Sequence, residues 1–179
     1  MDNLPTNYKF KDSIIFVGRI ERLKNQLNFI KAVNGLNIPC YIIGKPAIND
    51  SNYYKLCKKE AASNIFFINV LPQIEISSIM MSARVHVLTS WFETTGLVSL
   101  EAAYYGCNIV ITKKGDQEEY FNNNAFYCDP SNIDSIRNSI LKAYNAPFNE
   151  NFKTHIKNNY NWNKTAIQTK NCYLELINT

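Results

Sequence analysis

Two cations stand close to the end of the first apolar segment of the chain. The apolar run from Ser13 to Val17 ends at Gly18 and is followed by Arg19 and Lys24, just before a stretch with helical spacing. A cation in the first turn of a helix opposes the helix dipole by ~0.3 to 1 kcal/mol, unless an anion is bound between them. The segment therefore predicts either a phosphate-binding loop or a solvated basic loop.

A second candidate anion site follows the fourth apolar run. Thr94, Thr95 and Gly96 come directly before another helical pattern, and we expect Thr94 or Thr95 to cap that helix. A glycine lets a ligand come close to the backbone, so the free amides of Gly96, Leu97 and Val98 could face a phosphate.

Two carboxylates flank this helix start. Glu93 precedes it and Glu101 lies one turn beyond Leu97, so both are expected to look toward the same ligand. Carboxylates accept paired hydrogen bonds from neighbouring hydroxyls, which suits a sugar ring for one and a ribose for the other. The alternative is a capped helix that carries two ordinary acidic residues.

Apolar runs alternate with helical patterns along most of the chain. Runs that are apolar throughout indicate strands covered on both faces, and the alternation indicates βαβ units. The expected strands are 13–17, 40–43, 65–68, 85–88, 108–112 and 125–128, and the expected helices are 27–33, 52–62, 74–82, 96–105, 133–144 and 162–177. The predicted fold is α/β, a doubly wound, Rossmann-like parallel sheet of about six strands that binds ligands at the carboxyl ends of its strands.

Composition excludes several classes of protein. The 179 residues are 46% hydrophobic and 19% charged, which is typical of a folded globular chain. No apolar run is long enough to span a membrane and the start does not resemble a signal peptide, so we expect a cytoplasmic protein. Its five cysteines are scattered without a CxxC pair, which predicts buried reduced thiols. The mild net charge of +4 is dispersed, and we expect no nucleic-acid partner.

Other candidates for chemistry are weaker. His86 lies inside an apolar run and is expected to be a hydrogen-bonded core residue, while His155 is expected at the surface. Glu118 and Glu119 follow the fifth strand and are expected to form a solvated acidic pair. The sequence after the first strand has no GxGxxG and no P-loop lysine motif, which argues against a dinucleotide-binding dehydrogenase or a P-loop enzyme.

The motifs together resemble a known family. Gly18-Arg19-xxxx-Lys24 with Glu93-x7-Glu101 is similar to the nucleotide-binding half of GT-B glycosyltransferases of family 4, which are retaining enzymes that use nucleotide-diphosphate sugars. The resemblance spans nearly the whole chain. It extends to the LEAxxxG-like stretch Leu100 to Gly106, to Gly115-xx-Glu118, to Asp129-Pro130 and to Tyr160-Asn161-Trp162.

The resemblance implies a role for each motif residue. Arg19 and Lys24 would neutralise the donor pyrophosphate, Glu93 would hold hydroxyls of the transferred sugar, and Glu101 would take the ribose hydroxyls. The backbone amides of Gly96, Leu97 and Val98 would face the phosphates, and the backbone near Val70 and Leu71 would lie along one side of the base. The donor-binding positions so implied are Gly18, Val70, Leu71, Thr95, Gly96, Leu97, Val98 and Glu101.

The chain also departs from the family pattern. Asn25 replaces a usual Gly after the lysine, Asn69 a usual Gly before the base loop, Arg84 a usual Asp and Asn108 a usual Pro. The change at Asn69 leaves the donor base, UDP or GDP, undecided. Because no DxD sequence occurs, we expect no metal site and metal-independent catalysis.

Length bears on what the resemblance implies. GT-B enzymes have two Rossmann-like domains, and this chain has residues for the donor domain alone. We expect an interdomain linker over residues 1–12, a donor domain over 13–179 and an absent N-terminal domain that would bind a glycan or glycolipid acceptor. The isolated chain should then be nearly inactive. Polysaccharide biosynthesis and a peripheral contact with the inner face of the membrane are expectations at the level of the family.

Two other function classes stay open as alternatives. A nucleotide-binding or regulatory module descended from such a domain would keep the binding residues and lack transfer activity. A flavodoxin-like receiver domain would need an acidic pocket and a phosphoacceptor aspartate after the first and third strands, which the sequence does not supply.

Overall fold

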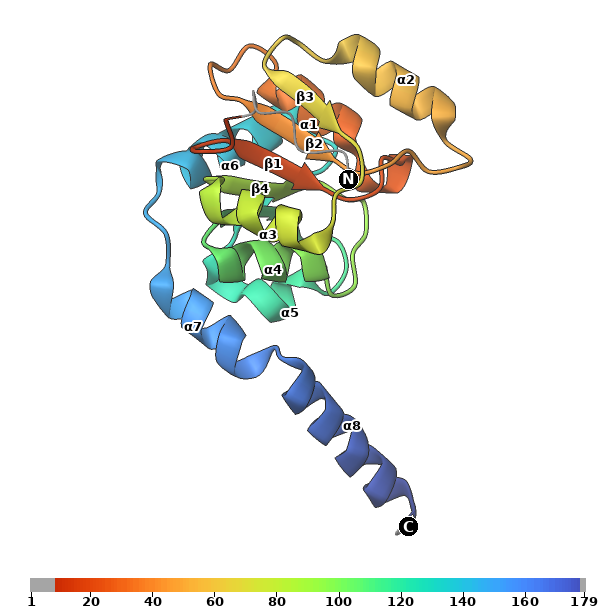
Figure 1. Ribbon diagram of the computed structural model, residues 1–179, viewed down its shortest axis with the longest axis vertical. Coiled ribbons are helices and arrows are strands. Elements are labelled where there is room, and N and C mark those ends of the chain that lie inside the picture. The colour runs from red at the N-terminus through yellow and green to blue at the C-terminus, as the bar shows by residue number, and fades with distance from the viewer. Residues whose placement is uncertain (1–8, 178–179) are drawn as a thin grey trace.

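The computed structural model describes residues 9–177. One sheet of six parallel strands, in the order β3-β2-β1-β4-β5-β6, forms its centre (Figure 1). The strands are β1 (Ile14–Val17), β2 (Cys40–Ile43), β3 (Ile65–Ile68), β4 (Val85–Leu88), β5 (Asn108–Thr112) and β6 (Phe126–Cys128). The order turns back between β1 and β4, which confirms the predicted doubly wound, Rossmann-like fold.

Helices cover the sheet in two layers. In one layer α1 contacts α2 and α6, and in the other α4 contacts α3 and α7 (Figure 1). The described helices are η1 (Arg22–Lys24), α1 (Gln26–Val33), α2 (Ser51–Glu60), α3 (Gln73–Ser82), α4 (Leu97–Tyr105), α5 (Gln117–Phe121), η2 (Asn122–Asn124), α6 (Ile133–Asn145), α7 (Glu150–Asn159) and α8 (Trp162–Ile177).

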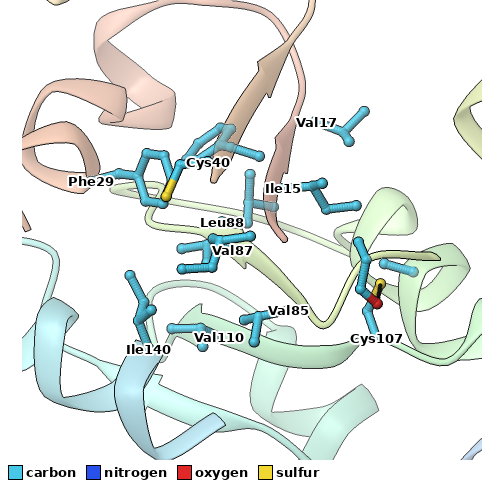
Figure 2. Packing of buried hydrophobic residues seen from close by; sticks show 14 of the residues in the cluster. Ile15, Val17, Phe29, Cys40, Val85, Val87, Leu88, Cys107, Val110 and Ile140 are labelled. Atoms are coloured by element: carbon cyan, nitrogen blue, oxygen red, sulfur yellow. Dashed lines mark hydrogen bonds between the residues drawn. The ribbon is translucent and has the colours of Figure 1, made fainter. Parts of the chain in front are cut away.

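The core lies between the sheet and these layers. Every residue of β1, β2, β4 and β5 is buried, as their continuous apolar runs predicted, because helices cover both of their faces. Figure 2 shows Phe29 of α1 and Ile140 of α6 gathered with the strand residues Val87 and Val110. The strands β3 and β6 lie at the two edges and are partly exposed.

Parallel strands bring their following loops to one edge of the sheet. The loop after β1 pairs with the loop after β2 through an isolated bridge between Ile20 and Pro46, and the loop after β4 pairs with the loop after β5 through Glu93 and Gly115. The expected ligand-binding edge is therefore a set of loops that hold one another in place.

Two α-helices of the described residues were not predicted. α5 has five residues, which is too short to show helical periodicity. α7 is polar apart from the pair Phe152 and Ile156, which is buried, and its start is capped by the Asn149 side chain accepting from the Phe152 amide at 3.1 Å. A single apolar pair spaced four apart is too weak a signal to predict a helix.

The last helix lies away from the rest of the fold. The sequence predicted α8, and Figure 1 shows it projecting beyond α7 with no buried residue among those described. Its apolar side chains are exposed, with Trp162 at 80% and Ile177 at 78%. Cys172 on α8 is also exposed, so the expectation of buried thiols is correct for four cysteines and wrong for this one.

The expected linker is described only in part. Residues 1–8 of the predicted 1–12 segment lie outside the described residues. The Lys9 amide donates to the Tyr41 hydroxyl at 3.2 Å, and the ring of Phe10 lies 4.7 Å from that of Tyr41, so the described end of the segment packs against β2. Between residues 9 and 177, the structure contains no helix long and apolar enough to cross a bilayer.

Candidate functional site

Lys24 and Glu93 form the centre of the carboxyl edge. Lys24 ends η1 after β1, Glu93 follows β4, and the Lys24 Nζ donates to Glu93 Oε1 in an ion pair. Both side chains are mostly buried, with 19% and 11% exposed respectively. The Glu93 carboxylate therefore supplies the negative charge that the position of Lys24 led us to expect.

Glu93 is held from two sides and keeps one oxygen free. Its Oε1 also accepts from the Ser90 hydroxyl at 2.6 Å, while Oε2 receives no hydrogen bond from any described residue. Its backbone is fixed by a bond from the Glu93 amide to the Lys114 carbonyl at 3.1 Å and by one from the Asp116 amide to the Glu93 carbonyl at 3.0 Å. The carboxylate is therefore fixed in place, with Oε2 left for a ligand.

Gly115 makes this close approach of the two loops possible. A Cβ on Gly115 would lie 1.9 Å from the Glu93 carbonyl oxygen, and its φ of +91° favours glycine. Gly115 opens the motif Gly115-xx-Glu118, and the close approach of the two loops gives a physical reason for a glycine at this position.

Arg19 lies apart from this pair. Its guanidinium is 64% exposed and contacts Glu21 at 3.1 Å. The backbone around it is ordered by the buried Gln26, whose Nε2 donates to the Arg19 carbonyl at 2.7 Å. Arg19 is thus an exposed cation on a fixed loop, beside the strand end at Gly18.

The start of α4 is built on Gly96, not on a threonine. Gly96 is the N-cap residue in the left-handed conformation, with φ 62° and ψ 48°, and no side chain caps the helix. The prediction that Thr94 or Thr95 caps it is wrong, because a left-handed residue at this position fits glycine best. The amides of Gly96, Leu97 and Val98 have no hydrogen-bond partner among the described residues.

Glu101 lies on the exposed side of α4, next to the start of α3. Its Oε2 accepts from Gln73 Nε2 at 3.2 Å, and Gln73 comes two residues after Leu71. The structure therefore brings the expected ribose residue beside the expected base loop. Within that loop, the amide of Val70 donates to Asn69 Oδ1 at 2.8 Å, so the amide is already engaged in the ligand-free chain.

Asn25 ties the two main loops together and was missed as a site residue. It has a left-handed φ of 60° and is buried, and its Nδ2 donates to the carbonyls of Thr89 at 3.2 Å and Pro130 at 2.8 Å. Asparagine tolerates this conformation better than other non-glycine residues. The signal in the sequence was the replacement of a usual glycine directly after Lys24, where a left-handed residue is needed.

His86 is a core residue, as predicted. It is fully buried, its Nε2 lies 3.1 Å from the Ser99 hydroxyl of α4, and its Nδ1 has no partner among the described residues. Burial lowers the pKa of His86 to about 3. His155 is exposed, and Glu118 pairs with Lys113 at 2.5 Å in an exposed ion pair.

Two hollows lie at the edge of the sheet opposite the carboxyl ends of the strands. One of about 530 Å³ lies beside Asn108 and Phe126, and one of about 400 Å³ lies beside Leu36 and Asn64. Both are at the amino ends of strands, away from Lys24 and Gly96. In residues 9–177, no group of three or more His, Cys, Asp or Glu side chains is arranged to hold a metal ion.

Comparison with known proteins shows the family of the chain. The family model described as glycosyl transferases group 1 matches residues 5–162. The chain belongs to this family. Family membership and fold together confirm the resemblance to one half of a GT-B glycosyltransferase and establish glycosyl transfer as the general activity of its relatives.

Three similar proteins illustrate the match. An uncharacterized glycosyltransferase of Methanocaldococcus jannaschii, MJ1607, is 26% identical over 171 residues, which cover 89% of this chain and 44% of that protein. Sucrose-phosphate synthase from Thermosynechococcus elongatus is 19% identical, with a TM-score of 0.81, covering 98% of this chain and 47% of the other. HepE from Anabaena is 19% identical, with a TM-score of 0.66, covering 75% and 39%. The chain thus spans about half the length of these relatives or less.

Proposed function

We propose that the chain is the donor-binding domain of a retaining glycosyltransferase that uses a nucleotide-diphosphate sugar. The observation that carries the proposal is the fixed Lys24–Glu93 pair, which lies between β1 and β4, where the strand order turns back. Ligands of doubly wound sheets bind at this point. The HepE structure named above is in complex with UDP-glucose, which supports a nucleotide sugar as donor.

The cations and the free helix amides suit a pyrophosphate. In our proposal, the donor phosphates replace the Glu93 carboxylate as partner of Lys24, Arg19 closes over them from its exposed position beside Gly18, and the amides of Gly96, Leu97 and Val98 bind the phosphate oxygens. Thr95, directly before this helix start, belongs to the same surface. Once the donor is bound in this way, the charges already face the leaving group, so its departure needs little further reorganisation.

The two carboxylates suit the hydroxyls of the donor. Glu93 has an unpaired Oε2 for the transferred sugar, and Glu101 has an exposed carboxylate for the ribose. The base would lie against the backbone near Val70 and Leu71. The Val70 amide donates to the Asn69 side chain, and the choice of UDP or GDP stays open.

The proposed reaction breaks the bond between the anomeric carbon and the β-phosphate oxygen. The acceptor hydroxyl attacks from the face that the nucleoside diphosphate leaves, so the anomeric configuration is retained, and the leaving phosphate takes the acceptor proton. Lys24, Arg19 and the α4 amides would stabilise the charge that develops on the phosphate, so the step needs no metal in our proposal. Glu93 would orient the sugar.

The acceptor would bind to a domain outside this chain. We propose that residues 1–12 link residues 13–179 to an N-terminal domain that binds a glycan or glycolipid acceptor. The exposed apolar side chains of α8 are a suitable surface for such a domain. A role in polysaccharide assembly, a cytoplasmic location and a peripheral contact at the inner face of the membrane follow from the same family-level reasoning.

The second candidate is a nucleotide-binding module without transfer activity. It is favoured by the same phosphate-binding features, because they require only binding. Replacement of Glu93 distinguishes the two functions, because a module that only binds the nucleotide does not require a carboxylate at the transferred sugar.

The test measures release of nucleoside diphosphate from UDP-glucose and GDP-mannose by the chain alone and by the chain supplied with an N-terminal acceptor domain. We expect almost no turnover by the chain alone and turnover with the added domain. Glu93→Gln should lower turnover at least about 100-fold while changing the nucleoside diphosphate Kd less than about tenfold. Full activity of the chain alone would refute the half-enzyme proposal, and nucleotide binding without any turnover, even with the added domain, would favour the binding module.

A further inference from the structure

Gln117, the first residue of α5, is a buried amide without a hydrogen-bond partner. Its exposed fraction is 0%, and neither Nε2 nor Oε1 is bonded to any described residue. Buried side-chain amides are nearly always hydrogen-bonded, because leaving them unpaired is costly. An exception of this kind points to a partner that the ligand-free chain does not supply.

The amide lies against the start of α4. A Cβ placed on Gly96 would lie 2.9 Å from Gln117 Nε2, so the amide lies directly against this glycine. Gly96 is also the residue that opens α4 and precedes the unbonded amides of Leu97 and Val98. The loop that carries Gln117 is bridged to Glu93 through Gly115. Gln117 therefore lies in the same part of the site as the backbone amides proposed to bind the phosphates and the Glu93 carboxylate proposed to hold the sugar.

The chemistry of an amide limits which chemical groups can be its hydrogen-bond partner. Nε2 donates and Oε1 accepts, and both are unsatisfied, whereas phosphate oxygens of the donor only accept. A hydroxyl group both donates and accepts. We propose that Gln117 is a further donor-contacting residue that hydrogen-bonds a hydroxyl of the transferred sugar; this rests on the proposed function of the site.

The contact requires a local shift of the chain. Gln117 is fully covered, so the sugar reaches it only when the segment around Gly96 moves. That segment has no side-chain cap to hold it, and a left-handed glycine adopts other backbone conformations readily. The competing explanation is a buried water molecule that satisfies the amide permanently.

The test replaces the amide by an apolar side chain of similar length, Gln117→Met. Kd values are measured by calorimetry for UDP, UDP-glucose, GDP and GDP-mannose. We expect the Kd for the nucleoside diphosphate that binds to stay within about twofold and the Kd for its sugar conjugate to rise about tenfold. Because the variant removes an unpaired buried amide, we also expect the Tm to rise by about 3 °C.

A matched control is Gln26→Met. Gln26 is equally buried, but its Nε2 donates to the Arg19 carbonyl at 2.7 Å and its Oε1 accepts from the Glu21 amide at 3.3 Å, so this substitution should lower the Tm. Gln117→Leu serves as a second variant if Gln117→Met does not fold.

The outcomes separate the proposals. A sugar-to-nucleotide ratio of Kd values unchanged in both Gln117 variants overturns the role of Gln117 and favours the buried water, even if nucleotide binding itself is normal. Failure of the unaltered chain to bind any of the four probes refutes the proposed function, and the Gln117 proposal with it.

Discussion

The buried histidine predicts how stability depends on pH. His86 has an ordinary pKa of about 6.5 in the unfolded chain, and burial lowers its pKa to about 3 in the folded chain. Below pH 6.5 the unfolded state therefore binds a proton that the folded state does not, so the free energy of unfolding falls as the pH falls. The loss starts near pH 6.5 and continues down to about pH 3.

The size of the effect follows from these two values. Between pH 7 and pH 5, protonation of one histidine in the unfolded state alone lowers the free energy of unfolding by about 2 kcal/mol. Urea unfolding followed by circular dichroism at both pH values measures this loss. In a His86→Gln variant, whose amide can still bond Ser99, the loss should be about 2 kcal/mol smaller, because the contributions of all other groups are shared.

The second histidine provides the control. His155 is exposed on α7, so a His155→Gln variant should keep the full loss of the unaltered chain. If the chain and the His86→Gln variant lose the same free energy between pH 7 and pH 5, the reasoning about the buried imidazole is refuted.

Three further predictions concern the loops and the last helix. Gly115→Ala should lower the free energy of unfolding by about 3 kcal/mol, because its Cβ would meet a carbonyl of the facing loop. Gly106 has a similar φ but open space around it, so Gly106→Ala should lower the free energy of unfolding by only about 1 kcal/mol. Thermal unfolding of both variants distinguishes the steric clash from backbone strain. Asn25→Gly should lower the free energy of unfolding by about 2 kcal/mol and weaken nucleotide binding. Asn28→Ala, which removes one hydrogen bond to a carbonyl, should lower the free energy of unfolding by about 1 kcal/mol and leave nucleotide binding unchanged. Equal nucleotide binding by both variants would contradict a positioning role for Asn25. Deletion of residues 162–179 should change the free energy of unfolding by less than about 0.5 kcal/mol, since the described helix buries nothing, and a larger change would show that α8 supports the fold.

The fold was predictable because it depends on local patterns. Each strand is a continuous apolar run, and β2, β3, β4 and β5 have the same bounds in the sequence-based prediction and in the structure. The carboxyl edge then follows from parallel strands, and so does the gathering of the loops that carry Lys24, Glu93 and Gly96. These conclusions need only the order of the elements.

The side-chain partners were not predictable in the same way. Lys24 and Glu93 are 69 residues apart, and their ion pair depends on how far each loop reaches over the sheet. Gly96 was expected to admit a ligand, yet its left-handed conformation also makes it the N-cap in place of a threonine. The burial of Gln117 depends on the bridge between two loops, which no local pattern reveals.

The exposure of α8 shows a further limit. An amphipathic pattern predicts a helix with an apolar face, and α8 is that helix. The pattern does not say what covers the face. In the described structure nothing does, and Trp162 and Ile177 remain exposed.

The most direct test of donor binding is calorimetric titration of the chain with UDP, GDP and ADP, with and without magnesium, alongside Arg19→Ala and Glu101→Ala variants. We expect one nucleotide to bind at micromolar to sub-millimolar concentration, independently of magnesium, and each substitution to weaken binding at least about tenfold. Binding that survives both substitutions, or that requires magnesium, would contradict the assignment of the pyrophosphate and ribose to this edge of the sheet.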